Sequence, residues 1–411
     1  MGSSARVARP PFAGRRILVG VTGGIAAFKS ISLARELALA GAEVDVVLTR
    51  GALQFVQPLS FEALTGRPVY SELYTPGDPL LHIRLARESD LILVAPATAN
   101  FIARAAAGMA DDLLAAVLLA TGTPVLFAPA MNDRMYSHPQ TRENVRRLEE
   151  IGYSRVGPEE GLLAWGEGEG EGRMLEPEAI LEHVARALTP RGELEGKAVV
   201  VTAGPTREAI DPVRFIGNRS SGRMGFAIAA AAWRAGARVT LISGPSHLPT
   251  PAGVTRLDIQ SAEEMQDAVE AALPEADVLV MAAAVADFRP SSSVADKIKK
   301  GAGKPEPLAL APTADVLRST VHLRKPGAVI VGFALETNDH KANAERKLKE
   351  KSLDFLVLNS ASEPGSGFEV PTNQVTILTP EGPAEELPLM SKDAVADKII
   401  GRISSALGGR R

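Results

Sequence analysis

The sequence predicts an α/β protein with two Rossmann-like, doubly wound domains. Three observations support this fold class. Each half of the chain begins with an apolar strand, a turn containing glycine and a helix. The expected strands are continuously apolar rather than alternating, which is typical of parallel strands covered on both faces. The strand–helix–strand order occurs twice in 411 residues, a length suited to two or three domains.

The first half begins with a strand at Arg16–Val21. A helical pattern follows from Ile25 to Ala40, and a glycine ends it. The second strand is expected at Val44–Leu48. Two further buried strands are expected at Leu91–Val94 and Pro124–Phe127, with a helix-rich segment between them.

The second half repeats this plan. A strand is expected at Lys197–Val201, a helix at Met224–Arg234 and a strand at Val239–Ile242. Val278–Met281 corresponds to the third strand of the first half. Any doubly wound fold produces such similarities, so we attribute them to the fold class rather than to an internal duplication.

The chain divides into three parts. Residues 1–14 have no periodicity and are expected to form a flexible tail. The join between the domains is expected within Leu188–Gly196, which is rich in proline and glycine, so the predicted domains are 15–190 and 191–411.

Gly166–Gly172 alternates glycine and glutamate and is expected to be a mobile surface loop or a lid over a site.

Composition excludes several classes of function. The 45 Lys and Arg against 49 Asp and Glu give a net charge of −4. This acidic balance, together with the lack of a long basic block, argues against a general nucleic-acid binder. No stretch approaches 18 apolar residues and no leader is visible, so we expect a cytoplasmic protein without a membrane partner. The absence of cysteine excludes disulfides, zinc–thiolate sites, Fe–S clusters and thiol catalysis.

The first half contains a candidate phosphate site. Gly23, Gly24 and Ile25 form the turn between strand and helix, where backbone N–H groups and the helix dipole favour an anion. This turn is not GxGxxG, and a tight turn also requires glycine. Polar and small residues follow the later strands at the same sheet edge, where a flat ring could lie close to the backbone. These residues are Thr49, Ala97, Thr98 and Asn100.

Two further polar residues carry weaker signals when each is taken alone. Asn132 follows the fourth strand, and capping of the next helix is the simpler interpretation. His82 precedes the third buried strand, and an isolated histidine is more often a surface residue than a base.

Together these segments resemble the flavin-dependent cysteine decarboxylases, specifically the phosphopantothenoylcysteine decarboxylase half of a bifunctional coenzyme A enzyme. The resemblance implies a flavodoxin-like decarboxylase domain with FMN, which oxidises the thiol end of the substrate before CO₂ is lost and the enethiol is reduced. It implies that His82 is the general base and that Asn132 binds the substrate carboxylate. The stretches that carry it are Val21–Lys29, Thr49–Pro58, His82, Asp90–Asn100, Gly108–Asp112, Ala128–Met135 and Gly172–Pro177.

The flap of this chain departs from that family. Family members carry a cysteine that protonates the enethiol carbon, but Trp165 stands at that position, ahead of Arg173 and Met174. Three explanations stay open: Glu167 or Glu169 donates the proton, water donates it inside a closed flap, or the second half-reaction is slow and releases enethiol. A substitute donor is the explanation we favour.

The second half contains a long polar insert between its first strand and helix. Residues 211–225 supply glycines, serines, arginines and Asn218 near a helix N-terminus, a composition suited to an anionic substrate or to a long capping loop. Asp287 follows a later strand, where it could bind ribose, a base edge or Mg²⁺. Lys297 lies in a lysine cluster, and Lys347 and Lys351 share one helix face, although each could simply be solvated.

These pieces resemble the CTP-using phosphopantothenate–cysteine ligases. The resemblance places Asn218 against the acyl-cytidylate intermediate. It places Ala283 and Asp287 at the cytidine and Phe333 against the nucleotide. It implies that Lys297, Lys347 and Lys351 bind the phosphates. It implies Mg²⁺ with CTP and a domain dimer in which a lysine-bearing loop crosses over. The family's Asn-Pro-Asp-Ile segment is replaced here by Thr313, Ala314, Asp315 and Val316.

The resulting prediction is a bifunctional enzyme of coenzyme A synthesis. CTP-dependent ligation joins cysteine to 4′-phosphopantothenate, and FMN-dependent decarboxylation yields 4′-phosphopantetheine. The resemblance implies a dodecamer of decarboxylase trimers and ligase dimers. Three alternatives remain: a nicotinamide- or flavin-dependent oxidoreductase, a non-catalytic flavin-binding protein, and a ligase with an impaired decarboxylase domain.

Overall fold

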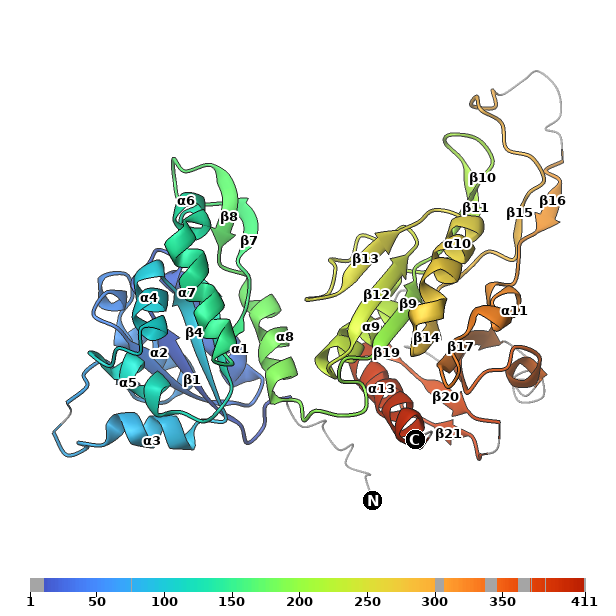
Figure 1. Ribbon diagram of the computed structural model, residues 1–411. Helices are drawn as coiled ribbons and strands as arrows, with labels where there is room; N and C mark the ends of the chain where they lie inside the picture. The colour runs from blue at the N-terminus through green and yellow to red at the C-terminus, as the bar shows by residue number, and fades with distance from the viewer. Residues whose placement is uncertain are drawn as a thin grey trace. The chain divides into compact units, whose positions relative to one another are not determined.

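The structure is a computed structural model. It describes residues 11–74, 76–299, 307–336, 346–360, 370, 372–380 and 382–409. The chain forms two compact units, which divide between Thr189 and Pro190. Each unit is an α/β fold around its own sheet (Figure 1).

Unit 1 contains a six-stranded sheet in which all neighbouring strands run parallel. The strand order is β3-β2-β1-β4-β5-β6, so the chain changes direction across the sheet between β1 and β4. Such a switch point opens a crevice at the carboxyl ends of the two strands. The strands are β1 (Arg16–Val21), β2 (Glu43–Leu48), β3 (Val69–Tyr70), β4 (Leu91–Ala97), β5 (Val125–Pro129) and β6 (Ser154–Arg155).

Helices cover both faces of this sheet, which is why β1 is apolar at successive positions. Ile17, Val19 and Val21 belong to one buried cluster with α1 and α8, whereas Leu18 belongs to the cluster on the other face with α3 and α5. The helices are α1 (Ala27–Leu39), α2 (Pro58–Thr65), α3 (Leu81–Glu88), α4 (Ala99–Ala106), α5 (Leu113–Ala120), α6 (Asp133–Ser137), α7 (Pro139–Glu150) and α8 (Pro177–Leu188).

A hairpin precedes α8 and contains most of the glycine–glutamate stretch. Strand β7 (Glu159–Leu162) pairs antiparallel with β8 (Glu169–Arg173), and β8 lies beside α6 (Figure 1). The stretch expected to be a mobile surface loop or a lid therefore includes part of a strand, Glu169–Gly172 of β8. Antiparallel pairing satisfies the backbone groups of β8 even though its side chains add little apolar surface.

Unit 2 contains an eight-stranded sheet in the order β13-β12-β9-β14-β17-β18-β20-β21. The strands are parallel through β18, and the last two are antiparallel. Its switch point lies between β9 and β14. The strands are β9 (Ala198–Ala203), β12 (Arg238–Ser243), β13 (Thr255–Asp258), β14 (Val278–Met281), β17 (Val329–Glu336), β18 (Phe355–Ser360), β20 (Val375–Leu378) and β21 (Glu385–Glu386).

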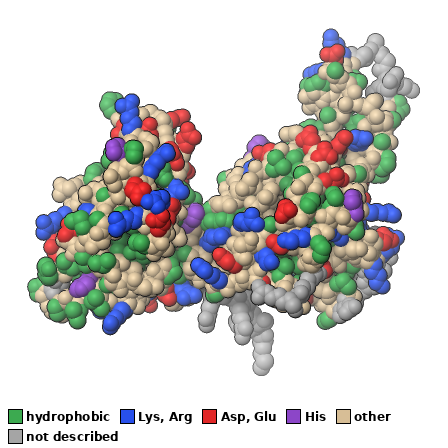
Figure 2. All heavy atoms as spheres, in the orientation of Figure 1, with side chains coloured by type: hydrophobic (Ala, Val, Ile, Leu, Met, Phe, Trp, Pro, Cys, Tyr) green, Lys and Arg blue, Asp and Glu red, His purple; other side chains and the backbone are tan. Residues whose placement is uncertain are grey.

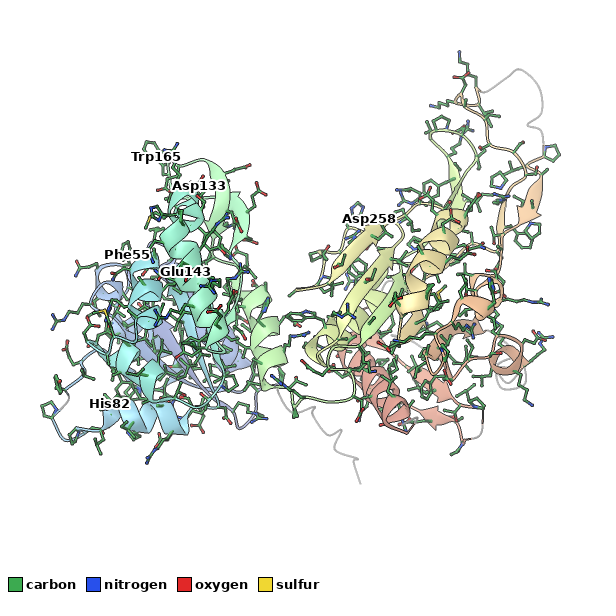
Figure 3. All side chains as sticks on the ribbon, in the orientation of Figure 1. Phe55, His82, Asp133, Glu143, Trp165 and Asp258 are labelled. Carbon is green, nitrogen blue, oxygen red and sulfur yellow. The ribbon has the colours of Figure 1, made fainter. Side chains whose placement is uncertain are left out.

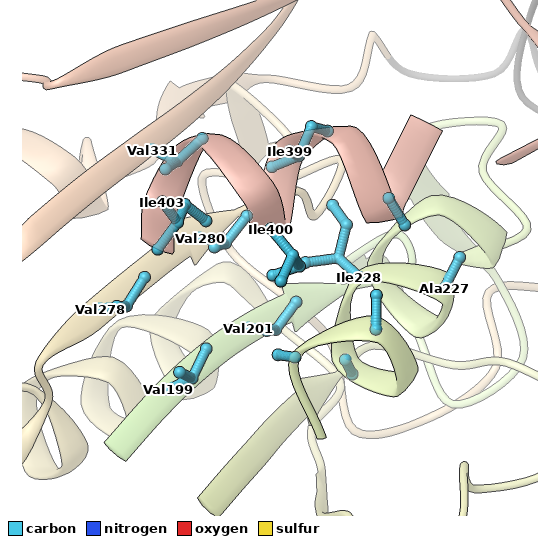
Figure 4. Close-up of a cluster of buried hydrophobic side chains, with 14 of the residues drawn as sticks. Val199, Val201, Ala227, Ile228, Val278, Val280, Val331, Ile399, Ile400 and Ile403 are labelled. Atoms are coloured by element: carbon cyan, nitrogen blue, oxygen red, sulfur yellow. The ribbon is translucent and has the colours of Figure 1, made fainter. Parts of the chain in front are cut away.

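One face of this sheet is covered by α9 (Arg223–Arg234) and α13 (Lys392–Gly408), and the other by α10 (Ala262–Ala272) and α11 (Val316–Ser319). Figure 4 shows Val199 and Val201 of β9 packed beneath Ile228 and Ile400 of the two covering helices. Three two-stranded ribbons complete the unit: β10 (Arg207–Ala209) with β11 (Phe215–Gly217), β15 (Phe288–Pro290) with β16 (Leu310–Pro312), and β19 (Thr372–Asn373) with β22 (Met390–Ser391).

The predicted fold class is confirmed, and the expected elements are found within a few residues of their predicted limits. The strand expected at Leu91–Val94 continues to Ala97, because its last three residues are still buried in the sheet. Side chains of both charges are interspersed over the visible faces of the two units (Figure 2). Among the described residues, no helix has the length and apolar character needed to cross a membrane.

Close packing of α9 on β9 generates a testable prediction. A Cβ atom on Gly225 would lie 2.5 Å from the Cβ of Ala203, whereas one on Gly401 of α13 would meet nothing within 4 Å. We expect Gly225→Ala to lower the free energy of unfolding of unit 2 by about 1–3 kcal/mol through overpacking. Gly401→Ala should raise it by about 0.5–1 kcal/mol, because glycine is a poor residue inside a helix.

Denaturant titrations followed by tryptophan fluorescence measure both effects. Trp233 is buried in α9 while Trp165 is fully exposed, so the change on unfolding reports unit 2. Equal stability of the two variants would show that the contact between α9 and β9 is not tight.

Candidate functional site

At the crevice of unit 1, a buried threonine hydroxyl group joins the ends of two neighbouring strands. Thr22 follows β1 and is 2% exposed. Its Oγ1 donates to the carbonyl oxygen of Pro96 at 2.8 Å and accepts from the backbone N–H of Thr98 at 3.1 Å. Thr98 in turn caps α4 by accepting a hydrogen bond from the N–H of Phe101. The ends of β1 and β4 are thereby fixed to each other at the switch point.

The two residues that follow Thr22 in the turn between β1 and α1 must be glycine, because neither position has room for a Cβ atom. A Cβ atom on Gly23 would lie 2.6 Å from the carbonyl carbon of Gly51, and one on Gly24 would lie 3.2 Å from the methyl group of Thr98. Thr49 holds the facing turn, because its Oγ1 accepts a hydrogen bond from the N–H of Ala52. The turn between β1 and α1 therefore presents backbone N–H groups to the crevice without side chains in the way.

A cavity of about 1050 Å³ opens above this turn. Its size is at the upper end of ordinary small-molecule sites. It brings together most of the residues predicted for the cofactor and flap sites. These are Gly23, Gly24, Ile25, Thr49, Thr98, Asn100, Asn132, Glu167, Arg173 and Met174.

Asn132 lines the cavity and also caps α6. Its Oδ1 accepts a hydrogen bond from the N–H of Arg134 at 2.9 Å. The cap fixes the orientation of the side chain, and the NH₂ group is left to donate to a ligand. The capping interpretation and the ligand-binding prediction are therefore compatible.

The base of the flap is attached to the cavity wall. Met131 donates its N–H to the carbonyl oxygen of Gly172 at 3.0 Å, and a Cβ atom on Gly172 would lie 2.2 Å from the carbonyl oxygen of Met131. Lys29 donates to the carbonyl oxygen of Met174 at 2.8 Å and contacts Glu176 at 2.9 Å. Burial alone would raise the pKa of Glu176, but hydrogen bonds from Lys29 and Arg173 lower it.

Three predicted residues of the first half do not line this cavity. Ala97 is buried in β4, where its carbonyl oxygen accepts from the N–H of Ala130. Trp165 projects from the tip of the flap and is fully exposed. His82 lies on α3, far from Trp165 and Asp133 in Figure 3. The Nδ1 atom of His82 is buried without a hydrogen-bond partner.

The cavity also contains charged residues to which the sequence analysis gave no role. Lys29, Arg104, Asp111 and Asp112 line it, and Arg104 pairs with both aspartates. Lys29 and Asp112 lie within stretches that carry the family resemblance, which is the signal that could have identified them.

Unit 2 repeats the arrangement at its own switch point. Thr202, near the end of β9, is fully buried and accepts a hydrogen bond through Oγ1 from the N–H of Ala283 at 3.1 Å. Thr206 accepts one from the N–H of Ala286 at 2.9 Å. Ala284 donates to the carbonyl oxygen of Gly204 at 2.8 Å. The segment that follows β14 is thus fixed along the end of β9.

A cavity of about 500 Å³ lies at this edge. Five lysine or arginine side chains and two aspartates line it, so it favours an anionic ligand. Ten of the residues predicted for the ligase site come together here. They are Asn218, Ala283, Asp287, Thr313, Ala314, Asp315, Val316, Phe333, Lys347 and Lys351.

Hydrogen bonds position several of these residues. The Nδ2 group of Asn218 donates to the carbonyl oxygen of Val285 at 3.0 Å. Thr313 donates through Oγ1 to the carbonyl oxygen of Ala286. Asp315 caps α11 and pairs with Lys351 at 2.9 Å. Phe333 packs against the core as well as lining the cavity, so its two interpretations do not exclude each other.

Lys297 does not line this cavity. It lies in a loop whose next residue, Ile298, donates its N–H to Asp211 at 3.1 Å. Burial alone would raise the pKa of Asp211, but backbone N–H groups of Val213, Arg214 and Ile298 hold it well below its usual range. The buried carboxylate thus anchors the lysine-bearing loop beside the β10–β11 ribbon.

Three cations of this cavity were given no individual role by the sequence analysis: Arg219 and Arg223, which belong to the polar insert that it singled out, and Lys392, which it missed. Arg223 is the first residue of α9, and Lys392 is the first residue of α13. Lys392 lies more than 160 residues from the polar insert, and no local motif marks it. Among the described residues no three His, Asp or Glu side chains are grouped as a metal site.

Comparison with protein families assigns both units. Residues 10–189 match the family model described as "Flavoprotein", and residues 194–407 match the model described as "DNA/pantothenate metabolism flavoprotein C-terminal domain". The solved C-terminal domain of a coenzyme A biosynthesis bifunctional protein CoaBC is similar to 53% of this chain and to all of its own length, with 38% identity and a TM-score of 0.45.

Full-length relatives are similar over both units. The coenzyme A biosynthesis bifunctional protein CoaBC of Vibrio vulnificus strain YJ016 is 45% identical over 96% of this chain and 99% of its own length. That of Bacillus subtilis strain 168 is 45% identical over 95% of this chain and 97% of its own length. The chain therefore belongs to the family of coenzyme A biosynthesis bifunctional proteins CoaBC.

Proposed function

We propose that the chain performs both reactions of coenzyme A synthesis expected from its sequence, one on each unit. Unit 2 ligates cysteine to 4′-phosphopantothenate with CTP, and unit 1 decarboxylates the product to 4′-phosphopantetheine. One observation carries this proposal: at each switch point a cavity is lined by most of the residues predicted for that reaction. The alternative of a nicotinamide-dependent oxidoreductase is not favoured by family membership.

FMN fits the cavity of unit 1. The turn at Gly23 and Gly24 and the cap at Thr98 offer N–H and hydroxyl groups for its phosphate, and the cavity is large enough for a flavin ring. When bound, FMN supplies the oxidation and final reduction of the substrate. Asn132 donates its NH₂ group to the substrate carboxylate and so orients the bond that breaks.

His82 is proposed to reach the reaction from a second copy of the chain. It is the predicted general base, yet it lies outside the cavity of its own unit. Lys297 likewise lies outside the cavity of unit 2, on an anchored loop. Each active site is then completed only in an oligomer, which agrees with the proposed trimers and dimers of a cytoplasmic dodecamer.

Glu167 is proposed as the substitute for the missing flap cysteine. It lines the cavity, whereas Trp165 points into solvent and Glu169 belongs to β8. After CO₂ is lost, the enethiol carbon that carried it takes the Glu167 proton, and the carbon–carbon π pair forms the new C–H bond. The sulfur is left as a thiocarbonyl, and bound FMN in its reduced form would supply the hydride that returns it to the thiol.

In unit 2 the 4′-phosphopantothenate carboxylate attacks the α-phosphate of CTP and displaces pyrophosphate. The cysteine amine then attacks the acyl cytidylate and displaces CMP. Asn218 holds the carbonyl of that intermediate, Lys347 and Lys351 bind phosphates, and Asp287 contacts the cytidine. Mg²⁺ arrives with the nucleotide and neutralises part of its charge.

Incubation with 4′-phosphopantothenate, cysteine, CTP and Mg²⁺ tests the function as a whole. Mass spectrometry should show pyrophosphate, CMP and 4′-phosphopantetheine, and the purified protein should show the absorbance of bound FMN. Arrest at the cysteine adduct or release of enethiol would show that unit 1 is impaired. Absence of both pyrophosphate and adduct would refute the ligase assignment.

A mixing experiment tests the role of His82. Chains with His82→Ala and chains with Asn132→Ala are each expected to be inactive as decarboxylases. When the two are coexpressed in equal amounts, about a quarter of the cavities should combine an intact Asn132 with an intact His82 from a neighbour. Decarboxylation should then return. No recovery would indicate that His82 acts within its own chain or not at all.

The flap variants Glu167→Gln and Glu169→Gln form a matched pair, since both remove one carboxylate from the same hairpin. Glu167→Gln should slow formation of 4′-phosphopantetheine by about 10²-fold or more and accumulate enethiol, because proton donation contributes that much. Glu169→Gln should leave the product ratio unchanged. Clean reduction by the Glu167 variant, followed by mass spectrometry, would eliminate the glutamate as donor.

Asn218→Asp tests the second step of the ligase. The substitution puts an anion beside the carbonyl oxygen of Val285 and beside the intermediate, so amide formation should fall by about 10²-fold. Rapid-quench analysis should show acyl cytidylate persisting while pyrophosphate release continues. Asn144→Asp on α7 of unit 1, outside the cavity of unit 2, is the control and should turn over normally. Normal turnover by Asn218→Asp would contradict the assignment.

A further inference from the structure

Asp211 is a buried carboxylate in an otherwise exposed part of unit 2. It lies in the turn that joins β10 to β11, and its side chain is 0% exposed, although Pro212 and Val213 beside it are exposed. Both of its oxygen atoms accept hydrogen bonds. Burial of a carboxylate is unfavourable unless such bonds compensate it, so the donors show what this side chain holds together.

The two oxygen atoms hold different segments. Oδ1 accepts from the backbone N–H groups of Val213 and Arg214, each at 2.8 Å, and so closes the turn. Oδ2 accepts from Nε of Arg214 at 2.9 Å and from the N–H of Ile298 at 3.1 Å. Ile298 lies 87 residues later in the chain, in the loop that follows β15, and β15 contacts β10 (Figure 1). One oxygen therefore shapes the ribbon, and the other attaches the loop to it.

Arg214 completes the attachment of the loop. Its Nη2 donates to the carbonyl oxygen of Ile298 at 2.6 Å and also pairs with Oδ2 of Asp211. Ile298 is thus bound through both its N–H and its carbonyl group, by two residues that are paired with each other. Lys297 directly precedes this Ile298 clamp, is exposed, and lies outside the cavity of unit 2. Its backbone is fixed to the β10–β11 ribbon while its side chain stays accessible.

We propose that Asp211 is a positioning residue of the ligase, which fixes the point from which Lys297 reaches the phosphates of CTP. This inference rests on the proposed ligase function and on the role of Lys297 in it. A lysine has a long flexible stem, so its ammonium group is placed well only where its backbone is held. A loop free to move on the ribbon would spread that charge over several positions and weaken its effect on the phosphates.

Asp211→Asn in the full chain separates the two tasks of the carboxylate. The amide oxygen can still accept from the turn, whereas the NH₂ group that replaces Oδ2 cannot accept from the N–H of Ile298. We expect kcat/KM for CTP to fall about tenfold or more, and the KM for cysteine to stay within about twofold. Asp211→Ser tests the same point by another route, because its hydroxyl can close the turn and offers no second oxygen.

Asp277→Asn is the matched control. Asp277 also accepts a backbone N–H, that of Ala198 at 2.9 Å, and also pairs with a cation, Lys325, at 2.8 Å. It precedes β14, whereas the cavity lies beyond the other end of that strand, and it does not line the cavity. Loss of this carboxylate should lower the melting temperature and leave kcat/KM for CTP unchanged.

Two further measurements distinguish positioning from a purely structural role. In a double-mutant cycle, adding Asp211→Asn to Lys297→Gln should cause no further loss of kcat/KM for CTP, because the carboxylate acts through that lysine. Limited digestion with trypsin should cleave after Lys297 and Lys299 faster in both Asp211 variants than in the unchanged protein or in Asp277→Asn, because the loop is released.

Several results would overturn the proposal. A further large loss of kcat/KM on the Lys297→Gln background would mean that Asp211 acts by another route. Unchanged kcat/KM in both Asp211 variants would contradict the positioning role, as would full activity of Lys297→Gln. A lower melting temperature with unchanged tryptic cleavage of the loop would leave Asp211 with a structural role alone. If the unchanged protein forms no cysteine adduct, the ligase function itself fails.

Discussion

Both cavities depend on one kind of interaction, a buried threonine hydroxyl that joins the first strand of a sheet to the strand across the switch point. Thr22 binds the backbone at Pro96 and Thr98, and Thr202 accepts from the backbone of Ala283. Without a hydroxyl the part-buried N–H groups of Thr98 and Ala283 would each lose a hydrogen-bond partner, which destabilises the strand ends. The connection holds the strand ends together while the loops beyond them diverge, and that divergence is the crevice.

This constraint explains which parts of the site were predictable. In a parallel sheet all strands end at one edge, so residues that follow buried strands meet there even when they are far apart in sequence. Gly23, Thr98 and Asn100 were predicted from that rule and line one cavity. The family resemblance, not the rule, singled out Asn132, which lines the same cavity, and Ala283 and Asp315, which line the other. To apply the rule, one needs only to know where each short apolar strand ends. Continuous runs of Val, Ile and Leu mark those ends clearly.

The parts of the fold and of the sites that were not predicted depend on contacts between segments far apart in the sequence, which the local pattern of residues does not encode. The glycine–glutamate stretch lacks apolar residues, yet its second part forms β8 by pairing with β7, and Gly172 bonds to Met131 at the cavity wall because its missing Cβ allows that approach. Lys392 lines the cavity of unit 2 because α13 packs on α9. His82 and Lys297 lie outside the cavities of their own units, so under the proposed function their roles depend on contacts between chains, which no pattern within one sequence encodes.

The cavities of the two units also differ in their balance of charge. In the first cavity Arg104 pairs with Asp111 and Asp112, and Lys29 pairs with Glu176. Under the proposed function this cavity holds the phosphate of FMN, for which backbone N–H groups suffice. In the second cavity cations outnumber carboxylates, and two of them stand at helix starts. Under the proposed ligase function this cavity holds a triphosphate, and its excess of cations over carboxylates suits a ligand of that charge.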